Sequence, residues 1–403
     1  MTKRFTVAIG LGLCSLTLSA QQFLQTEVLE FAISPCGTFY TPDLPPAGYH
    51  PSAPFGFTNG FGIVTDADAD GWEVGSPAPS CGDYIAPGSP VEGFSVQVGD
   101  VFKTNADQFF DTCGNAEIFS NSLSSGPAGD FRLALWTGSR NGLSIRQSTV
   151  TKEGEAMMIH RVKLCNNSAS TLDSVFYQRF LDPDPDNTLT GNFATRNRIL
   201  PDVLVGSAVE AAGYAVGECR ITLLSPDERA RASIGGFFGD KPTFGYYGEN
   251  FFQNSGSIIG DFGVQITFNL GSLEPGECDC AAFAYVFRRQ DYDRAYSVAT
   301  QACSAFDAFD TDGDAEALAS RLFGTNAQEV DRDLTWLAIP GGFQLMDLGG
   351  DEQVRIYDLG GRLVQASFST GNVQTITGLP AGMYLIQVQD QSGTLRSGKA
   401  VVQ

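Results

Sequence analysis

Histidine is scarce in this chain, because His50 and His160 are the only two among 403 residues. No H-E-x-x-H pair occurs, which excludes a zinc protease of that type. The sequence also lacks a G-x-S-x-G elbow, a G-x-x-x-x-G-K-S/T phosphate loop and a credible dinucleotide fingerprint. Hydrolysis by a Ser-His-Asp triad and nucleotide chemistry are therefore unsupported, and no catalytic residue is assigned from the sequence.

Basic residues are also few, since 25 Lys and Arg stand against 46 Asp and Glu, for a net charge of −21. The first 20 residues hold Lys3 and Arg4 and no acid, so the chain without them carries −23. A surface this acidic is repelled by DNA, by RNA and by anionic membranes. We expect no nucleic-acid partner.

Long apolar runs are missing as well, and no segment approaches the roughly 18 residues that a membrane-spanning helix needs. The stretch from Phe5 to Leu18 follows two basic residues and is typical of the core of a secretory signal peptide. We expect cleavage after Ala20, so residues 1–20 form the signal peptide. The sequence predicts a secreted protein without a transmembrane segment.

Cysteine is present nine times, with Cys14 inside the predicted signal peptide. An even number in the secreted remainder indicates disulfides rather than a metal site, because Cys-x-Cys is an unusual spacing for zinc. Cys278 and Cys280 lie on the same face of a predicted strand and should have different partners, with Cys303 a candidate for one of them. The disulfide candidates are Cys36, Cys81, Cys113, Cys165, Cys219, Cys278, Cys280 and Cys303.

Alternating apolar and polar residues recur between glycine-rich turns, and 30 Phe and 12 Tyr supply an aromatic core. Long strands separated by long polar loops favour one large antiparallel β-sandwich over 21–341, of the supersandwich kind seen in carbohydrate-active and mutarotase-like proteins. A short late helical segment covers 290–303 and 316–323. Strands 263–270 and 280–287 are expected to form a hairpin.

Aspartates alternate with spacer residues in three segments that predict calcium sites, because calcium takes about six to eight oxygen ligands. The first begins like an EF-hand loop, but Pro77 stands where that loop needs its last acid. The alternative for each group is a solvated acidic turn. The groups are Asp66, Asp68 and Asp70; Asp182, Asp184, Asp186 and Asn187; and Asp310, Asp312 and Asp314.

Two other groups of residues are candidates for acting on or binding a glycan. Glu92, Asp83, Tyr177 and Arg179 offer the acids and polar partners that glycan chemistry needs, although a structural role is favoured for each. The segment 235–254 interleaves aromatic residues with glycines, acids and amides. Such a loop either stacks on sugars or pins itself to the core, and packing is favoured here.

The region 343–403 carries the most specific pattern in the chain. Short alternating strands and glycine-rich turns follow in the order VRIYDLGGRLV, TGLPAGMYLIQVQD and GKAVVQ. This region resembles the type A C-terminal sorting domain of proteins exported by the type IX secretion system. The matching positions are Ile356, Tyr357, Asp358, Gly361, Arg362, Leu379, Pro380, Gly382, Tyr384 and Lys399.

The resemblance implies a small C-terminal β-sandwich, 342–403, that the outer-membrane export machinery reads and usually removes. The main domain then stays on the outer cell surface or is released. Its expected role is non-catalytic binding of a glycan or surface protein, or surface structure, supported by calcium. Two alternatives stay open: a secreted carbohydrate-active enzyme with carboxylates on a sandwich face, and a self-assembling surface or fibre component.

Overall fold

The chain, seen in a computed structural model, divides into two compact units between residues 322 and 323. Each unit has its own hydrophobic core. No helix in the described residues combines the length and apolar character needed to cross a membrane. The structure describes residues 21–49, 60–66, 81–87, 91–108, 117–200, 206–236, 240–323, 336–339, 341–346, 348, 352–358, 363–369, 371, 373–389 and 395–402.

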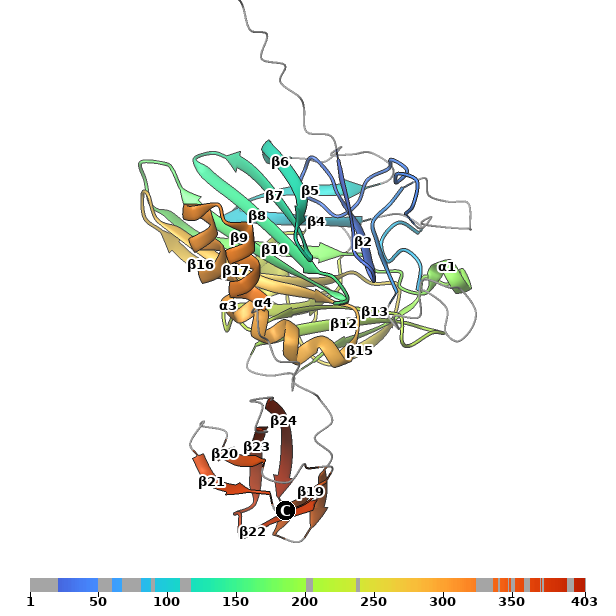
Figure 1. The fold of residues 1–403 in the computed structure, drawn as a ribbon. Coiled ribbons are helices and arrows are strands. Elements are labelled where there is room, and N and C mark those ends of the chain that lie inside the picture. The colour runs from blue at the N-terminus through green and yellow to red at the C-terminus, as the bar shows by residue number, and fades with distance from the viewer. Residues whose placement is uncertain are drawn as a thin grey trace, which may run out of the picture. The chain divides into compact units, whose positions relative to one another are not determined.

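Two antiparallel sheets pack face to face in the first unit (Figure 1). In the described part of the chain, the larger sheet has the spatial order β15 (Ser257–Gly260), β11 (Thr195–Ile199), β12 (Ser207–Gly213), β13 (Arg220–Ser225), β17 (Cys278–Val286), β9 (Met157–Asn166), β8 (Leu143–Lys152), β7 (Phe131–Arg140) and β6 (Phe119–Ala128). The smaller sheet has the order β14 (Ala230–Ile234), β16 (Val264–Leu273), β10 (Leu172–Leu181), β4 (Val91–Val98) and β5 (Val101–Gln108). A third sheet joins β1 (Gln22–Gln25), β2 (Leu29–Ile33) and β3 (Ile63–Thr65). The predicted large antiparallel sandwich is confirmed.

Strand β9 shows how the sequence pattern places its two faces. Met158, Val162 and Leu164 point into the sandwich core, as their alternation predicts. Arg161 and Lys163 lie on the opposite face, where their Nη2 and Nζ atoms are 2.6 and 2.7 Å from Oδ1 of Asp307. The outer face of the larger sheet is therefore charged where it meets a helix.

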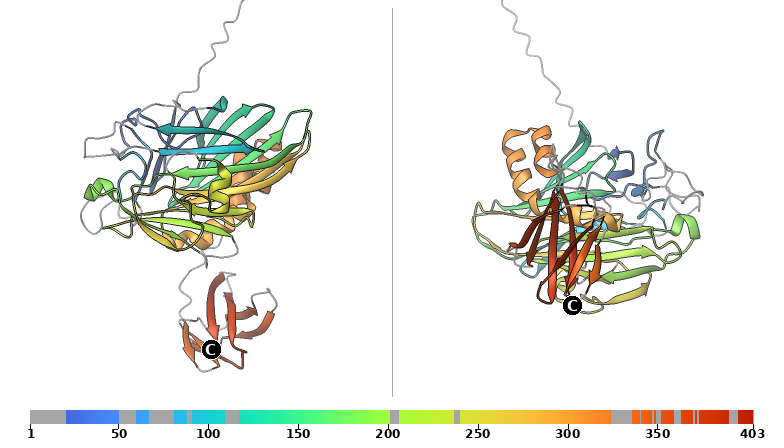
Figure 2. Two further views of the ribbon diagram at one scale, coloured as in Figure 1. Left: turned by 180° about the vertical axis from the view of Figure 1, so that it is seen from behind. Right: turned by 60° about the horizontal axis from the view of Figure 1, so that its bottom comes forward.

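That helix is α3 (Tyr292–Asp312), which packs on β9, β13 and β17 (Figures 1 and 2). It ends at Gly313, whose left-handed backbone (φ 67°) suits glycine, and α4 (Ala315–Phe323) follows. These two helices confirm the predicted late helical segment. The buried residues of α3 recur at helical spacing: Tyr292, Ala295, Val298, Ala299, Ala302, Ala305, Phe306 and Phe309. The shorter helices are α1 (Asn187–Thr190), α2 (Pro242–Tyr247) and the 3-10 turn η1 (Arg289–Asp291).

Three disulfides cross-link the described residues of this unit: Cys81–Cys219, Cys165–Cys278 and Cys280–Cys303. The second joins neighbouring strands β9 and β17, and the third joins β17 to α3. The expectation that Cys278 and Cys280 have different partners, one of them Cys303, is confirmed. Cys36 is also disulfide-bonded, and Cys113 lies outside the described residues.

The expected hairpin of β16 and β17 is wrong. β16 pairs with β10 and β14 in the smaller sheet, whereas β17 pairs with β9 and β13 in the larger one. The turn 274–277 therefore carries the chain from one sheet to the other. Alternation along a strand indicates which residues face the core, but it does not select the neighbouring strand.

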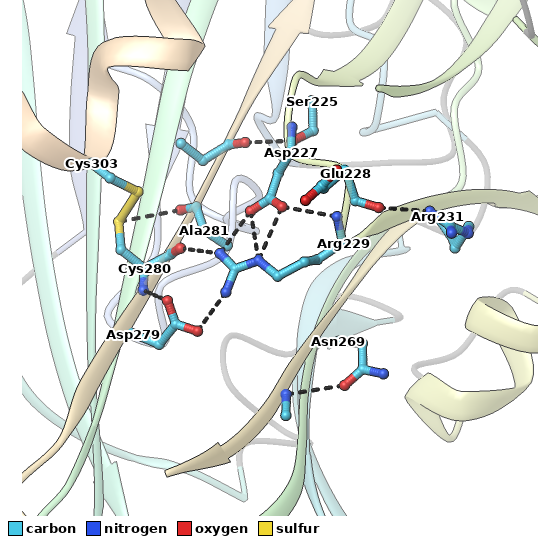
Figure 3. Close-up of polar contacts among 12 residues, drawn as sticks. Ser225, Asp227, Glu228, Arg229, Arg231, Asn269, Asp279, Cys280, Ala281 and Cys303 are labelled. Carbon is cyan, nitrogen blue, oxygen red and sulfur yellow. Dashed lines mark hydrogen bonds and ion pairs between the residues drawn. A yellow bond between two sulfur atoms is a disulfide. The ribbon is translucent and has the colours of Figure 1, made fainter. Parts of the chain in front are cut away.

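Arg229 ties the two sheets together near this crossing (Figure 3). Its Nη2 is 2.8 Å from Oδ2 of Asp227, and its Nη1 is 2.5 Å from Oδ2 of Asp279. Nη2 also donates to the carbonyl of Cys280 in β17 (2.8 Å). The Arg229 carbonyl accepts from the N–H of Asn269 in β16 (3.2 Å), so one residue contacts a strand of each sheet.

The second unit is a small sandwich of two sheets around a separate core, as predicted. The described strands of one sheet are β18 (Trp336–Ile339), β19 (Gly342–Met346) and β22 (Val373–Thr377). Those of the other are β21 (Leu363–Phe368), β20 (Gln353–Asp358), β23 (Gly382–Gln389) and β24 (Leu395–Val402). The expected domain boundary at residues 341 and 342 falls at the turn between the paired strands β18 and β19.

Glu210 of β12 connects the larger sheet to the start of α3. Its carboxylate accepts hydrogen bonds from Arg289 (2.7 Å), Tyr292 (2.8 Å) and Arg220 (3.0 Å). Burial by itself raises the pKa of Glu210, but the hydrogen bonds from Arg289 and Tyr292 and the charge of Arg220 lower it to about 2. The folded protein therefore favours the ionised carboxylate.

We predict that Glu210→Gln makes the protein less stable at neutral pH. Because the folded pKa lies below the unfolded value of 4.5, the ionised group stabilises the fold above pH 4.5, and that stabilisation is lost as pH falls toward 2. Urea unfolding at pH 7 should show a loss on the order of 2 kcal/mol, shrinking toward zero near pH 2. The exposed Glu228→Gln serves as the control. A loss that is the same at every pH would contradict this account.

Candidate functional site

Glu92 and Arg179 form an ion pair in the middle of the sandwich. Nε of Arg179 on β10 is 2.5 Å from Oε1 of Glu92 on β4, and both side chains are fully buried. The same Nε donates to the hydroxyl of Tyr285 on β17 (2.8 Å), and that hydroxyl donates to Oε1 of Glu92 (3.2 Å). Oε2 of Glu92 accepts from the N–H of Phe39 (2.5 Å). Both members of the pair belong to the smaller sheet, and the hydrogen bonds with Tyr285 connect them to the larger one.

The charges of this pair depend on each other. Burial raises the pKa of Glu92, and the charge of Arg179 opposes that rise. Burial also works against the charge on Arg179, but the carboxylate of Glu92 outweighs it and the pKa of Arg179 is raised. Burial raises the pKa of nearby Tyr177 to about 12. The phenol of Tyr177 therefore stays protonated at neutral pH.

His160 lies beside this network on β9. Its Nδ1 is 2.9 Å from Oγ1 of Thr149, and its ring centroid is 5.0 Å from that of Phe283. Burial, together with the charge of Arg179, lowers the pKa of His160 well below its ordinary value, so the ring is neutral at neutral pH. A void of ≈ 10 Å³ next to His160 and Thr149 is no larger than one water molecule. His160 and Thr149 are both buried in the first unit, and His50 lies outside the described residues.

The second predicted acidic group lies where β10 ends, held by the surrounding backbone. The Asp184 N–H donates to the carbonyl of Tyr84 (2.8 Å). Oδ2 of Asp186 accepts the N–H groups of Ala215 and Val216, each at 2.9 Å. The segment is thus a fixed part of the fold.

Three carboxylate oxygens of this group are buried without a hydrogen-bond partner: the Oδ1 atoms of Asp182, Asp184 and Asp186. Asp184 is 3% exposed, and Asp186 is fully buried. Burial and Asp261 raise the pKa of Asp182 to about 8. Burial and the neighbouring aspartates 182, 261, 186 and 83 raise the pKa of Asp184 well above its ordinary value. Such repulsion is relieved by bound protons or by a cation.

Asp261 also belongs to the acidic group after β10, although the sequence did not indicate it. Strand pairing brings it there. Val264 of β16 pairs with Leu181 of β10, so the segment before β16 lies beside the segment after β10. Only that register would have identified Asp261. In the described parts of the chain, no three His, Cys, Asp or Glu side chains converge closely enough to hold a metal between them. A cation here would also need backbone or water oxygens.

Asp83, singled out from the sequence, belongs to the same neighbourhood. Its carboxylate accepts from the backbone N–H groups of Gly62, Ile85 and Ala86 at 2.8 to 2.9 Å. Burial raises its pKa to about 6 against those bonds. Of the first predicted acidic group, the buried Asp66 follows β3, whereas Asp68 and Asp70 lie outside the described residues.

The third acidic group is engaged by the protein itself. Asp310, within α3, has Oδ2 3.0 Å from Nη2 of Arg161. Asp312 pairs with Arg321 (2.8 Å), and Oδ1 of Asp314 accepts from a backbone N–H at the start of α4 (2.9 Å). These carboxylates hold α3 on the sheet and α4 beside α3.

The residues of the sorting-domain resemblance fall on the second unit's strands and turns. Ile356, Leu379 and Tyr384 belong to its core, and the Tyr384 hydroxyl donates to the carbonyl of Pro380 (2.8 Å). Gly382 begins β23, and Lys399 lies within β24. Tyr357 and Asp358 end β20, whereas Gly361 and Arg362 lie outside the described residues.

The aromatic loop partly packs and partly faces solvent. Phe252 is buried (4% exposed), and Tyr246 packs edge-on against Phe176 of β10 (5.5 Å between ring centroids). Tyr247 is 59% exposed and Phe251 is 69% exposed. The favoured packing interpretation therefore holds for two of these rings and fails for the other two.

The chain matches no known family profile and no curated protein sequence. Among solved structures, a polysaccharide lyase aligns at 11% identity over 94% of this chain and 47% of its own, with a TM-score of 0.33. The α-galactosidase AgaB of Geobacillus stearothermophilus aligns at 10% over 70% and 41%, with a TM-score of 0.27. A putative aldose 1-epimerase of Escherichia coli K12 aligns at 12% over 66% and 98%, with a TM-score of 0.28. The chain spans less than half the length of the lyase and of the α-galactosidase. TM-scores this low do not support a conclusion about function.

We predict that removing one member of the Arg179–Glu92 pair destabilises the protein more than removing both. Arg179→Met leaves a buried carboxylate without its cation and should lower the free energy of unfolding by about 3–5 kcal/mol, measured by urea denaturation. The double variant Arg179→Met with Glu92→Leu should regain much of that loss, because it buries no charge. The exposed Arg196→Met is the control. A double variant no more stable than Arg179→Met would contradict the ion-pair account.

Proposed function

We propose that this chain is an extracellular or surface-attached protein, exported by the type IX secretion system, whose main domain acts in non-catalytic binding or surface structure. The observation that supports the non-catalytic role is the burial of Glu92 and Arg179. A carboxylate and an arginine that could serve glycan chemistry are fully buried and bonded to each other. They stabilise the sandwich and contact no solvent.

Two features support an extracellular setting. Disulfides persist in oxidising compartments, and three are formed within the described residues of the first unit. The residues that resemble the sorting domain lie in a unit with its own core. A tag that is folded by itself can be read and removed without disturbing the cargo.

We predict that the second unit directs export. A chain truncated after Leu322 keeps all three disulfides and the first unit's core, and it should accumulate in the periplasm of a bacterium that has the type IX machinery. The full-length chain should reach the medium or the cell surface, as measured by fractionation and immunoblot. A periplasmic reporter fused to residues 323–403 is the matched control and should also be exported. Equal export with and without these residues would sink the proposal.

Calcium is the proposed partner of the acidic group at the end of β10. Asp182 and Asp184 each bring an unpartnered, buried carboxylate oxygen, and Asp186 and Asn187 follow on the same turn. Oxygen ligands suit a hard cation, and carbonyls or water complete its shell. The positive charge of bound calcium would relieve the repulsion between the neighbouring carboxylates.

We predict a calcium-dependent gain in thermal stability. Millimolar calcium should raise the unfolding midpoint of the full-length protein by a few degrees over excess chelator, because it binds the folded state. Asp184→Asn should abolish this shift, and in chelator it should be at least as stable as wild type, since repulsion is reduced. Asp312→Asn, in the third acidic group, should keep the shift. An unchanged shift in Asp184→Asn would rule out this site.

A further inference from the structure

Two exposed aromatic rings flank one tight turn on the outer side of the smaller sheet. Tyr247 ends α2, which packs on β10, β14 and β16, and Phe251 follows four residues later. Their exposed fractions, 59% and 69%, are high for side chains of this size. Exposed aromatic surface on a secreted protein is a mark of an interaction site.

Each exposed ring is backed by another ring. Tyr247 lies edge-on to Tyr246, with centroids 5.0 Å apart and an interplanar angle of 84°. Phe251 stacks on the buried Phe252, with centroids 5.4 Å apart and an angle of 16°. Both orientations are therefore set before any ligand arrives, which lowers the entropy cost of binding.

The backbone of the turn is equally constrained. Gly248 has left-handed geometry (φ 70°), and Asn250 has φ 57°, which is uncommon for a residue with a side chain. The N–H of Glu249 donates to the carbonyl of Phe244 (3.0 Å), and the N–H of Phe252 donates to the carbonyl of Glu249 (3.1 Å). Asparagine tolerates this left-handed conformation, and the two hydrogen bonds fix the shape of the turn.

Polar groups lie directly between the two rings in the sequence. Glu249 and Asn250 are exposed at the tip of the turn, and they offer a carboxylate and an amide. The surface thus combines apolar ring faces with hydrogen-bonding groups within a few residues. A pyranose has the same combination, because its C–H face is apolar and its edge carries hydroxyls.

We propose that Tyr247 and Phe251, with Glu249 and Asn250, form a binding surface for a neutral glycan. The exposed carboxylate of Glu249 at the tip of the turn favours a neutral sugar, because it repels the carboxylates of uronic acids and the sulfates of sulfated sugars. A protein partner would need about 800 Å² of contact on each side, far more than two rings supply. The inference rests on the proposed extracellular binding role and names its ligand class.

The test is binding of purified full-length protein to immobilised neutral oligosaccharides of glucose, galactose and mannose, followed by titration calorimetry with the best ligand. Tyr247→Ala and Phe251→Ala should each weaken binding by about tenfold, as expected for one lost ring contact. Tyr247→Phe keeps the ring and should retain affinity. Phe119→Ala removes a ring that is 68% exposed on β6 of the larger sheet and should change nothing.

The inference would be overturned if the protein bound none of the neutral glycans. It would also be overturned if both alanine variants bound as tightly as the wild-type protein. Preference for an acidic glycan, or capture of a surface protein by the same residues, would overturn the ligand class. Tyr247→Ala should be exported like wild type, because the turn is remote in sequence from the second unit. Loss of glycan binding with intact export, or the reverse, therefore separates this inference from the proposed function.

Discussion

The ion pair between Arg179 and Glu92 is the interaction on which the first unit depends. Burying one of these charges without its partner costs more free energy than a single hydrogen bond contributes. Each side chain therefore requires the other. Tyr285 of β17 is hydrogen-bonded to both members of the pair, which links the larger sheet to β4 and β10 of the smaller one. The aromatic residues around it, including Phe39 and Phe94, pack against the guanidinium at 4.6 and 5.8 Å from their ring centroids. The centre of the sandwich is therefore filled, and its charges are neutralised from within the chain.

The acidic group at the end of β10 shows the opposite arrangement. There the carboxylates of Asp182 and Asp184 lie among other aspartates, whose charges add to burial and raise the pKa of both. Strand β10 thus carries Arg179, which neutralises Glu92, and it is followed just beyond its end by aspartates that raise one another's pKa. This contrast is the reason for proposing a bound cation at the acidic group after β10 and none at the Arg179–Glu92 pair.

Because the interior of the first unit is filled, the proposed binding surface lies at its periphery. The aromatic turn after α2 keeps two rings exposed, each beside a ring that packs on the fold. Disulfides and ion pairs, such as those of Arg161 and Arg229, hold the outer elements in place. The proposed picture is a rigid extracellular scaffold with a small binding surface and a separately folded export tag.

Sequence reasoning recovered what depends on local pattern. The strand faces of β9, the helical spacing of α3, the separate partners of Cys278 and Cys280, and the grouping of Asp182 with Asp184 all follow from residue spacing. Long-range pairing could not be read this way. The sequence predicted β16 and β17 as a hairpin, yet they lie in different sheets, and Asp261 reaches the acidic group only through the β10–β16 register. Alternation determines which side of a strand is apolar, whereas the choice of neighbour and the burial of each charge depend on how the whole core packs.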